Sequence, residues 1–485
     1  MKKIAIILSG AVILRMINIF SPVSGWHSWR QADTGSIARN FYENGFNILY
    51  PQINWGGSRT GFVESEFQIF PFLVSILYSV FGINDTWGRV VSLVCSVFTI
   101  FGLYLLVRKI INEETAIWSA VIYAILPLNI FYGRAFMPDS AMLMCSVYGI
   151  YFFYRWTENE SIKYFILSGL FISLAALIKL PALYLGLPLI YLVYQKSGWK
   201  LFTDLRLYIL AILIIAPVAL WYYHAHQLFL NGGSSFGIWT YGQDKWGMFS
   251  LLTDPAWYND IFFKSIAERH LTYPAFILFV WGLFIKRTFT NEKLFDVWLI
   301  AVLIFIFIAA QAHRAQEYYT LPFTIPASVF TGKFLAKYLP LFSRKFKEIY
   351  KANKLITSFA VICFLLTGVL SYLRVARFYS SESLSQPIFK IAAEVQSVTK
   401  PGDKIITIGD GNPVYLYHSH RFGWTAMPQQ IDSLFIASRV KEGAKLIAGE
   451  KNVFIQNSSA GKIDFLLNNY KVIKNEPDYI IVGLE

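Results

Sequence analysis

The sequence predicts an α-helical polytopic membrane protein of about eleven spans, with a C-terminal α/β domain outside the membrane. Of the 485 residues, 55% are hydrophobic and only 15% are charged, whereas a soluble domain carries about 25% charged residues. Long apolar runs recur as far as Tyr372, and none follows. We therefore expect a membrane domain at 1–373 and an extracytoplasmic domain at 374–485.

Apolar runs define the predicted spans, because a helix needs roughly 20 apolar residues to cross a bilayer. The runs are 4–20, 88–107, 115–133, 139–156, 163–179, 181–195, 204–224, 272–286, 294–311, 318–337 and 355–373. The first resembles a signal peptide at its start. It is long for a signal core, and no small-residue cleavage site follows it, so we expect it to be retained.

Basic residues orient these spans, because Lys and Arg concentrate in cytoplasmic loops. Lys2 and Lys3 place the N-terminus in the cytoplasm. The later basic loops alternate correctly only if the apolar run 67–82 does not cross the bilayer. We interpret it as a half-buried helix at the outer surface. The net charge of +13 is thus explained by orientation in the membrane, and it does not indicate nucleic-acid binding.

The resulting topology gathers unusual polar residues on the outer side of a plasma membrane. A first outer loop spans 21–87 and a large outer loop spans 225–271. The outer polar residues are Asp33, Glu64, Glu66, Asp139, Lys179, His226, Glu268, His270 and the segment His313 to Tyr319. This convergence was not used to build the topology, and it favours chemistry at the outer face.

Asp33 precedes a predicted surface helix with the sequence SIARNFYENGF. One interpretation is a helix N-cap, which stabilises by about 1 kcal/mol. The other is a general base, because a fixed carboxylate at headgroup depth can take a proton from an acceptor hydroxyl. Two tryptophans in the preceding WHSWRQAD segment would anchor the loop at that depth.

Glu64 and Glu66 flank Ser65 and would share a face in an extended segment. Such a pair can hold a divalent cation, Mg²⁺ or Mn²⁺, or bind sugar hydroxyls. The alternative is a solvated pair that ends a loop. Asp33 and Asp139 are further candidate cation ligands, and the metal requirement stays open. His224 and His226 suggest a metal only weakly, because the spacing places no third ligand.

Asp139 and Lys179 are charged residues at the outer ends of predicted spans. Asp139 follows GRAFMP, so it is a candidate helix cap or, with Arg134, part of an outer cavity. Lys179, in LIKLPAL, is a snorkelling lysine or a cation facing the phosphate of a lipid-linked substrate. His313 and Arg314 are similar candidates for stabilising charge on a leaving phosphate.

The C-terminal region has strand-like runs at 404–409, 451–456 and 479–482, bounded by Gly, Pro and Asp. Helical periodicity covers 384–398 and 431–440. These patterns predict a small α/β domain. The three cysteines lie in apolar runs and indicate neither a disulfide framework nor a metal motif.

Several segments together resemble bacterial members of the GT-C glycosyltransferase superfamily, in the branch related to protein O-mannosyltransferases and lipid A aminoarabinose transferases. The segments are HSWRQADTGSIARNFYENGFNILYPQINWGG, VESEF with PFLVSILYSVFG, GRAFMPD, LIKLPAL and HRAQEYYTLPFTIP. The resemblance covers most of residues 1–340. It implies a polyprenyl-phosphate-linked sugar donor and transfer with inversion outside the membrane.

The resemblance also implies roles for individual residues. Asp33 matches the essential base, Asp139 a second acidic position, and Lys179 a basic residue near the donor phosphate. His313, Glu317 and Tyr318 match a segment that borders the cavity. Glu64-Ser65-Glu66-Phe67 with Pro71 replaces the tight charged-residue-Pro-Pro element of the best-known relatives.

We therefore expect a glycosyltransferase that moves a sugar from a polyprenyl phosphate to a hydroxyl of a protein, lipid or polysaccharide. Two alternatives remain open. One is a transporter or flippase of lipid-linked saccharides, because intramembrane charges also mark transport paths. Such proteins often carry repeated halves, and the chain has none that we can detect. The other is a glycan ligase or polymerase, which shares the chemistry.

Overall fold

The chain folds into two compact units. The computed structural model describes residues 2–237, 249–340, 346–382 and 386–484. Unit 1 comprises Met1–Ile19, Arg89–Tyr222 and Trp239–Phe378, and unit 2 comprises Phe20–Gly88, Tyr223–Ile238 and Tyr379–Glu485. The first outer loop therefore folds together with the C-terminal α/β domain, a grouping that the sequence analysis does not predict.

Unit 1 is helical, and every apolar run assigned to it forms helix. Its first half contains α1 (Lys2–Met16), most of α4 (Asp85–Ile110), α5 (Glu113–Ile125), α6 (Pro127–Tyr132), α7 (Asp139–Asn159), α8 (Ile162–Ile178), η1 (Leu180–Leu185), α9 (Gly186–Ser197), η2 (Gly198–Thr203) and most of α10 (Leu205–Leu230). Its second half contains α12 (Phe249–Leu252), α13 (Pro255–Tyr258), the π-helix η3 (Asn259–His270), α14 (Tyr273–Leu283), α15 (Leu294–Ile308), α16 (Ala310–Ala315), η4 (Glu317–Phe323), α17 (Thr324–Tyr338), α18 (Phe346–Ala352) and α19 (Lys354–Ser380).

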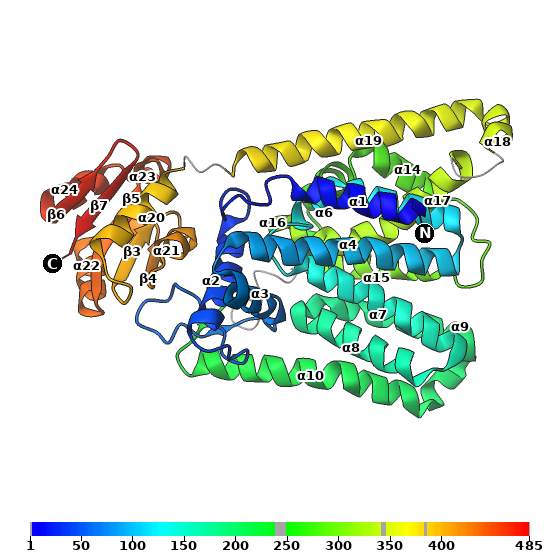
Figure 1. The fold of residues 1–485 in the computed structure, drawn as a ribbon, viewed down its shortest axis with the longest axis horizontal. Helices are drawn as coiled ribbons and strands as arrows, with labels where there is room; N and C mark the ends of the chain where they lie inside the picture. The colour runs from blue at the N-terminus through cyan, green and yellow to red at the C-terminus, as the bar shows by residue number, and fades with distance from the viewer. Residues whose placement is uncertain (1, 238–248, 341–345, 383–385, 485) are drawn as a thin grey trace. The chain divides into compact units, whose positions relative to one another are not determined.

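Small residues let α4, α7, α8 and α10 pack side by side (Figure 1). A Cβ on Gly102 would lie 3.0 Å from Tyr148, and one on Gly149 would lie 2.5 Å from Ile172. Ser173 donates to the backbone oxygen of Ile214 at 3.4 Å. Close backbone approach and polar side-chain contacts of this kind are typical of helix packing in membranes.

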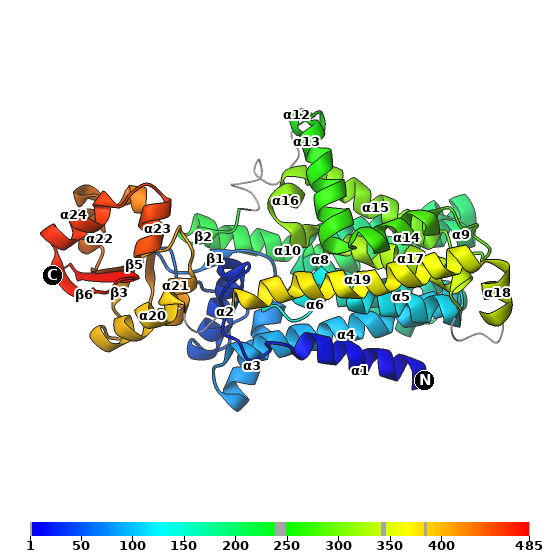
Figure 2. The ribbon, with the colours of Figure 1, turned by 90° about the horizontal axis from the view of Figure 1, so that it is seen from above.

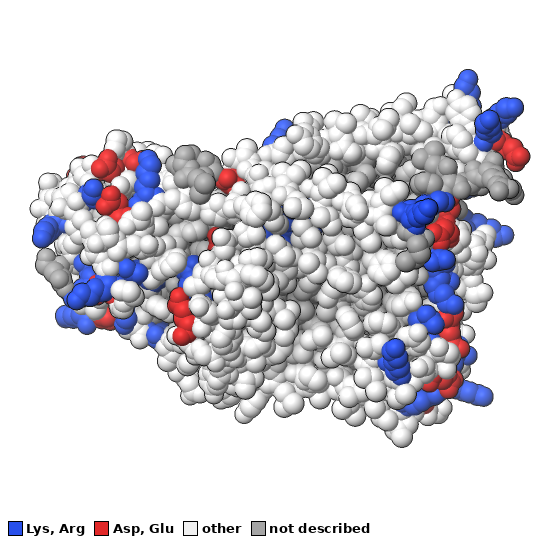
Figure 3. Space-filling view, viewed as in Figure 1, with Lys and Arg blue, Asp and Glu red and all other residues white. Residues whose placement is uncertain are grey.

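The helices agree with a membrane protein, although the count of eleven spans remains a prediction. Within the described residues, three helices are long and apolar enough to cross a bilayer, namely α4, α10 and α19. Figure 3 shows a broad face of unit 1 with little charge, and Lys, Arg, Asp and Glu gather at the end where α9 and α18 lie. Such a belt is expected where lipid replaces water.

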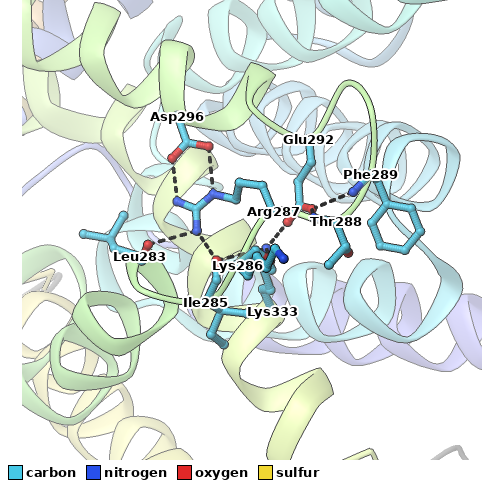
Figure 4. A network of polar contacts seen from close by, with 9 residues as sticks. All are labelled: Leu283, Ile285, Lys286, Arg287, Thr288, Phe289, Glu292, Asp296 and Lys333. Carbon is cyan, nitrogen blue, oxygen red and sulfur yellow. Dashed lines mark hydrogen bonds and ion pairs between the residues drawn. The ribbon is translucent and has the colours of Figure 1, made fainter.

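A polar network holds the predicted cytoplasmic loop between α14 and α15 (Figure 4). Lys333 of α17 pairs with Glu292 and donates to the Lys286 carbonyl at 2.8 Å. Arg287 pairs with Asp296 of α15, with 2.9 Å between Nε and Oδ2. A cavity of about 610 Å³ lies at this end, and none of the candidate site residues lines it. Ion pairs and hydrogen bonds among residues of unit 1 therefore hold this loop in place.

Unit 2 contains α2 (Ser28–Glu43), α3 (Ile69–Phe81) and the two-residue strands β1 (Val63–Glu64) and β2 (Ser234–Ser235). β1 and β2 are parallel, with Val63 opposite Ser234. α3 buries Phe70, Val74 and Tyr78 and exposes residues on its other face. The run is thus helical, as expected, and its position at the outer surface of a bilayer remains a prediction.

The α/β domain of unit 2 is built on a five-stranded sheet in the order β4-β3-β5-β7-β6. The strands are β3 (Lys404–Ile408), β4 (Gly423–Ala426), β5 (Ala444–Glu450), β6 (Lys471–Asn475) and β7 (Tyr479–Gly483). β4, β3 and β5 are parallel, whereas β7 is antiparallel to β5 and to β6. The helices are α20 (Pro387–Val398), α21 (Val414–Ser419), η5 (Pro428–Gln430), α22 (Ser433–Lys441), α23 (Lys451–Gln456) and α24 (Gly461–Asn469). Figure 2 shows α20 on one face of the sheet and α23 and α24 on the other.

The predicted strand at 451–456 is wrong, because these residues form the one-turn helix α23. The strand lies just before it, in β5, whose Ala and Gly residues give a weak strand signal. A Cβ on Gly449 would lie 3.0 Å from Ile408 and from Phe454, so β3 and α23 pack closely on β5 at this residue. Phe454 reaches the core from the helix. A short apolar run does not separate helix from strand without this context.

Contacts with the α/β domain hold the first outer loop. A Cβ on Gly35 would lie 2.7 Å from the Tyr417 hydroxyl, so α2 approaches α21 closely. Arg39 donates to the Tyr417 carbonyl at 2.8 Å. Trp55 forms a parallel bridge with Gly423, the first residue of β4. The loop that carries Asp33 is therefore fixed by the domain that follows the last helix.

Candidate active site

Asp33 lies in the second turn of α2, and the N-cap interpretation is wrong. The helix begins at Ser28, five residues before the aspartate. His27 occupies the cap position in a left-handed conformation and makes no side-chain cap bond. The predicted segment SIARNFYENGF begins at Ser36 and misses the first eight residues of the helix, because the WRQ residues there form no apolar stripe.

The Asp33 carboxylate is buried, with 3% of the residue exposed. Trp55 donates its indole N–H to Oδ1 at 2.9 Å, and no hydrogen bond to Oδ2 is described. Burial raises the pKa of Asp33 to about 7, against the opposing effects of the Arg30 charge and the Trp55 hydrogen bond. Asp33 therefore exchanges a proton near neutral pH.

Arg30 and aromatic rings enclose this carboxylate within unit 2. Arg30, one turn before Asp33, pairs with Glu66. Its guanidinium lies 5.0 Å from the centroid of the Phe236 ring. Phe236 stacks on Trp55 with ring centroids 6.3 Å apart. Residues from α2, the first outer loop and the segment after β2 thus build one polar site with aromatic walls.

Glu64 has a different environment from Glu66, so the two do not act as a pair. Glu64 is fully buried and accepts from the Ser235 hydroxyl. Its Oε1 lies 2.8 Å from Nδ1 of His226. These contacts join β1, β2 and the end of α10. His224 turns to the Leu49 carbonyl, which lies 2.8 Å from its Nε2.

The carboxylates do not fit a divalent-cation site. Asp33 and Glu64 accept from Trp55 and Ser235, and Glu66 pairs with Arg30. Over the described ranges, no group of three or more His, Cys, Asp or Glu side chains is placed to hold a metal ion. Mg²⁺ and Mn²⁺ demand several oxygens at once, and these three carboxylates have separate partners, so they do not form one such set. We assign no chemical step to a metal.

Unit 1 brings Asp139 and Lys179 together. Lys179, at the end of α8, places Nζ 2.7 Å from Oδ1 of Asp139, which is fully buried. Asp139 is the first residue of α7, and Pro138 before it makes no side-chain cap bond. The ammonium also lies 4.5 Å from the centroid of the Tyr318 ring and 5.2 Å from that of Tyr319. Snorkelling therefore does not describe Lys179, since its charge is held inside the protein.

Glu317 forms a second polar group in unit 1, at the start of η4. It accepts from the Tyr132 hydroxyl at 3.2 Å, and its Oε2 lies 3.4 Å from Nη1 of Arg269. The Tyr132 and Tyr318 rings lie 6.1 Å apart, which connects this group to Lys179. Lys179 and Arg269 are thus two cations joined through one carboxylate–tyrosine cluster.

His313 and Arg314 point to different surroundings. His313 is buried, with Nδ1 2.9 Å from the Thr320 hydroxyl, and burial lowers its pKa to about 3. Burial likewise lowers the pKa of His270 to about 4. Both imidazoles are therefore neutral at pH 7. Arg314 pairs with Asp254 and Asp260, at 3.4 and 3.0 Å.

Arg134 contacts two segments of unit 1. It is fully buried and donates to the Asn18 carbonyl at 3.3 Å. Its guanidinium lies 5.7 Å from the centroid of the Phe131 ring. These contacts join the loop after α6 to the end of the first helical segment.

Sequence reasoning missed Trp55, Phe236 and Arg269 as site residues. Trp55 lies in INWGG, which is part of a segment that resembles the GT-C family, and Arg269 precedes His270 in the large outer loop. Both residues could therefore have been selected from the sequence. Phe236 had no signal, because only the β1–β2 pairing brings it to α2. The aromatic segment IWTYGQDKWG at 238–247 lies outside the described residues.

Known structures share this fold. ArnT from Cupriavidus metallidurans, solved bound to undecaprenyl phosphate, matches with a TM-score of 0.67 at 12% identity, over 99% of this chain and 97% of that one. The Archaeoglobus fulgidus oligosaccharyltransferase matches with a TM-score of 0.59 at 12% identity, over 97% of this chain and 72% of that one. The oligosaccharyltransferase AglB from Archaeoglobus fulgidus, solved with an inhibitory peptide and a dolichol-phosphate, matches with a TM-score of 0.58.

The chain has the GT-C glycosyltransferase fold. A family model described as dolichyl-phosphate-mannose-protein mannosyltransferase matches residues 68–223. No curated protein matches the chain in sequence. The predicted resemblance to the GT-C superfamily is confirmed in the fold, and the match of the family model over residues 68–223 supports the prediction of a glycosyltransferase.

Proposed function

We propose that this GT-C protein transfers a sugar from a polyprenyl phosphate to an acceptor hydroxyl on the extracytoplasmic side, with Asp33 as the general base. The observation that carries the proposal is the environment of Asp33. It is buried, anchored through Oδ1 by Trp55, and has a pKa raised by burial to about 7. A base poised near the working pH is the most effective one for removing a hydroxyl proton.

The proposed reaction is a direct displacement. The acceptor O–H gives its proton to Oδ2 of Asp33 as its oxygen attacks the anomeric carbon. The bond from that carbon to the phosphate oxygen breaks, and the polyprenyl phosphate leaves with the bonding electrons. Attack opposite the leaving group inverts the anomeric configuration. The step needs no covalent enzyme intermediate, in contrast to nucleophilic catalysis.

Lys179 and Arg269 are the cations that we assign to the donor phosphate. Lys179 is held by Asp139 and by two tyrosine rings, and Arg269 by Glu317. Fixed positive groups stabilise the charge that develops on a leaving phosphate. This choice replaces His313, whose burial keeps it neutral, and Arg314, which pairs with two carboxylates. The undecaprenyl phosphate and dolichol-phosphate of the similar structures support a lipid phosphate donor.

Reconstituted transfer tests the proposal. Purified protein in liposomes would receive radiolabelled polyprenyl-phosphate sugars and a crude envelope extract, with and without chelator. We expect label to move to an acceptor with the wild type and at least about a hundredfold more slowly with Asp33→Asn, because general bases contribute about 10²–10⁴-fold. Glu43→Gln, an exposed carboxylate on the same helix, is the matched control and should keep full activity.

Two results would contradict this assignment. Full activity in Asp33→Asn would remove the base role. No transfer from any donor, together with movement of the lipid-linked sugar between leaflets, would favour the transporter interpretation instead. Loss of activity with chelator would require a metal that the carboxylate contacts do not suggest.

A further inference from the structure

A cavity of about 230 Å³ lies in unit 2, at the carboxyl ends of the parallel strands β3 and β5. Gly409, the residue after β3, and Glu450, the last residue of β5, contribute to its wall. β3 leads through α21 to β4 on one side, and β5 lies on its other side. In open α/β sheets, ligands preferentially bind at the carboxyl ends of two neighbouring strands whose following connections run to opposite sides of the sheet.

The lining of this crevice is polar but carries no cation. The residues are Ser24, Gly25, Ser28, Gln386, Ile388, Gly409, Asn412, Val414, Tyr415 and Glu450. Hydroxyls, side-chain amides, one carboxylate and one aromatic ring are thus combined. This set offers both donors and acceptors at short range, and it lacks the Lys or Arg that an anionic ligand requires.

Side-chain contacts fix the polar groups of the crevice. The Tyr415 hydroxyl donates to Oε2 of Glu450 at 2.8 Å. Asn412 donates to the Ser28 hydroxyl at 3.2 Å, and its own oxygen accepts from the Val414 N–H at 3.0 Å. Burial raises the pKa of Tyr415 above its ordinary value, so its hydroxyl remains a donor. The amide and the carboxylate are therefore oriented before any ligand binds.

Ser24 supplies a second, independent observation. It is 1% exposed, and its hydroxyl has no hydrogen-bond partner among the residues that the structure describes. A buried hydroxyl without a partner costs about 1–3 kcal/mol. A ligand hydroxyl in the crevice that Ser24 lines would satisfy it.

The loop after β3 packs against the Tyr415 ring and contains two left-handed residues. A Cβ on Gly409 would collide with the Tyr415 ring, so the ring lies directly on the backbone. Asp410 and Gly411 both have positive φ, at 56° and 73°. A left-handed non-glycine residue is held only where the surroundings demand it, and such residues cluster at ligand sites.

We propose that this crevice binds a neutral sugar ring of the acceptor. Its volume is below the roughly 300–1,000 Å³ of drug-sized sites, which suits one small polar ring. A carboxylate and an amide can each bond two neighbouring hydroxyls, and the Tyr415 ring offers an apolar face. A phosphorylated ligand is disfavoured by Glu450, by the missing cations and by the brevity of α21, which is only six residues long.

The crevice also adjoins the helix that carries the base. Ser28 lines it and is the first residue of α2, whereas Asp33 follows five residues later. Five residues of α-helix span about 7.5 Å. A sugar bound in the crevice is therefore separated from the Asp33 carboxylate by no more than about the length of two sugar rings. The assignment of this sugar to the acceptor rests on the proposed function, and it makes the acceptor a glycan.

Saturation-transfer NMR on the full chain in nanodiscs tests the site without any donor lipid. The probes are mannose, glucose, galactose and N-acetylglucosamine, with ethanolamine and inorganic phosphate as charged alternatives. We expect signal from at least one neutral sugar. Its affinity should fall about tenfold in Glu450→Gln and in Asn412→Ala, since each change removes about one hydrogen bond to the ligand.

Asp464→Asn is the matched control, because Asp464 is an exposed carboxylate on α24 of the same domain. It should bind the sugar like the wild type, and thermal unfolding should report all three variants as folded. The site is refuted if no neutral sugar gives signal, if only ethanolamine or phosphate binds, or if both crevice variants bind normally.

A transfer assay then separates the two proposals. Excess of the bound sugar should inhibit transfer in the wild type, and less so in Glu450→Gln. Binding without competition would refute the acceptor role while leaving the sugar site intact. Binding in a protein that transfers from no donor would refute the proposed function alone.

Discussion

At the scale of single residues, burial determines the chemistry of Asp33. Its pKa is raised to about 7 because the carboxylate loses water, while Arg30 and Trp55 recover only part of that loss. The role of this residue as a base remains a prediction, whereas the helix-cap alternative is wrong because the helix begins five residues earlier. Sequence identifies which residue can carry a proton, and packing sets the pH at which it does so.

The pH profile of transfer reports on this carboxylate. Only the ionised form accepts a proton, so we expect kcat/KM for the acceptor to rise with pH and to level off above about 7. Trp55→Phe removes a hydrogen bond that favours the ionised form. The midpoint should therefore move upward, by about one pH unit. Steady-state kinetics between pH 5 and 9 measure both, and an unchanged midpoint in Trp55→Phe would show that another group is titrating.

Variants of the Asp139–Lys179 pair can distinguish a structural role of this pair from a role in transfer. Lys179→Met leaves Asp139 buried without its partner, which costs roughly 3–5 kcal/mol. Lys179→Met combined with Asp139→Asn should recover most of the lost thermal stability, because no uncompensated charge remains. Transfer should stay low in the double variant, with a raised KM for the donor. Recovery of transfer would mean that the pair only supports the fold.

At the scale of elements, contacts with strand β4 of the five-stranded sheet hold the loop that bonds α2. Trp55, which bonds Asp33, forms a bridge with Gly423 of β4, and Gly57 donates its N–H to the Gly423 carbonyl at 2.8 Å. The apolar runs could be predicted because spanning helices need length and hydropathy alone. The two-residue strands β1 and β2 could not, since pairing between distant segments leaves no periodicity.

Two glycines of the first outer loop test this attachment. Gly57 and Gly45 have φ of 69° and 96°, so an alanine is strained at both positions. Only at Gly57 would the new Cβ collide with Trp424, whereas no atom lies within 4 Å at Gly45. We expect Gly57→Ala to reduce transfer at least about tenfold, because small displacements of a catalytic group are costly. Gly45→Ala should lower only the stability of the protein. Equal transfer in the two variants would show that the contact between Gly57 and Trp424 does not position Asp33.

At the scale of the whole molecule, the chain is divided differently from its sequence order. Unit 2 is assembled from three segments, which include the first outer loop and the α/β domain. The expected boundary at 373 follows composition, which changes there. Composition does not report that α2 and the loop around Trp55 pack on α21 and β4.

Membrane orientation is testable with single cysteines, because the three native ones are buried. Asp464→Cys on α24 should react with a membrane-impermeant thiol reagent in intact cells. Lys200→Cys, exposed in η2, should react only after permeabilisation, since its basic loop is predicted to be cytoplasmic. The reverse pattern would invert the topology, and with it the side on which Asp33 acts.

The sequence by itself determined the membrane class, the positions of the apolar helices and the GT-C resemblance, and it selected Asp33, Asp139 and Lys179 as candidate site residues. These properties follow from local composition and residue type, and they can be read without knowing which residues are in contact. Only the tertiary structure decided that Glu64 and Glu66 have separate partners, that burial keeps His313 neutral, and that Trp55, Phe236 and Arg269 belong to the sites. Each of these depends on the burial of a group, or on contact between segments far apart in the chain, and burial and contact are properties of the fold.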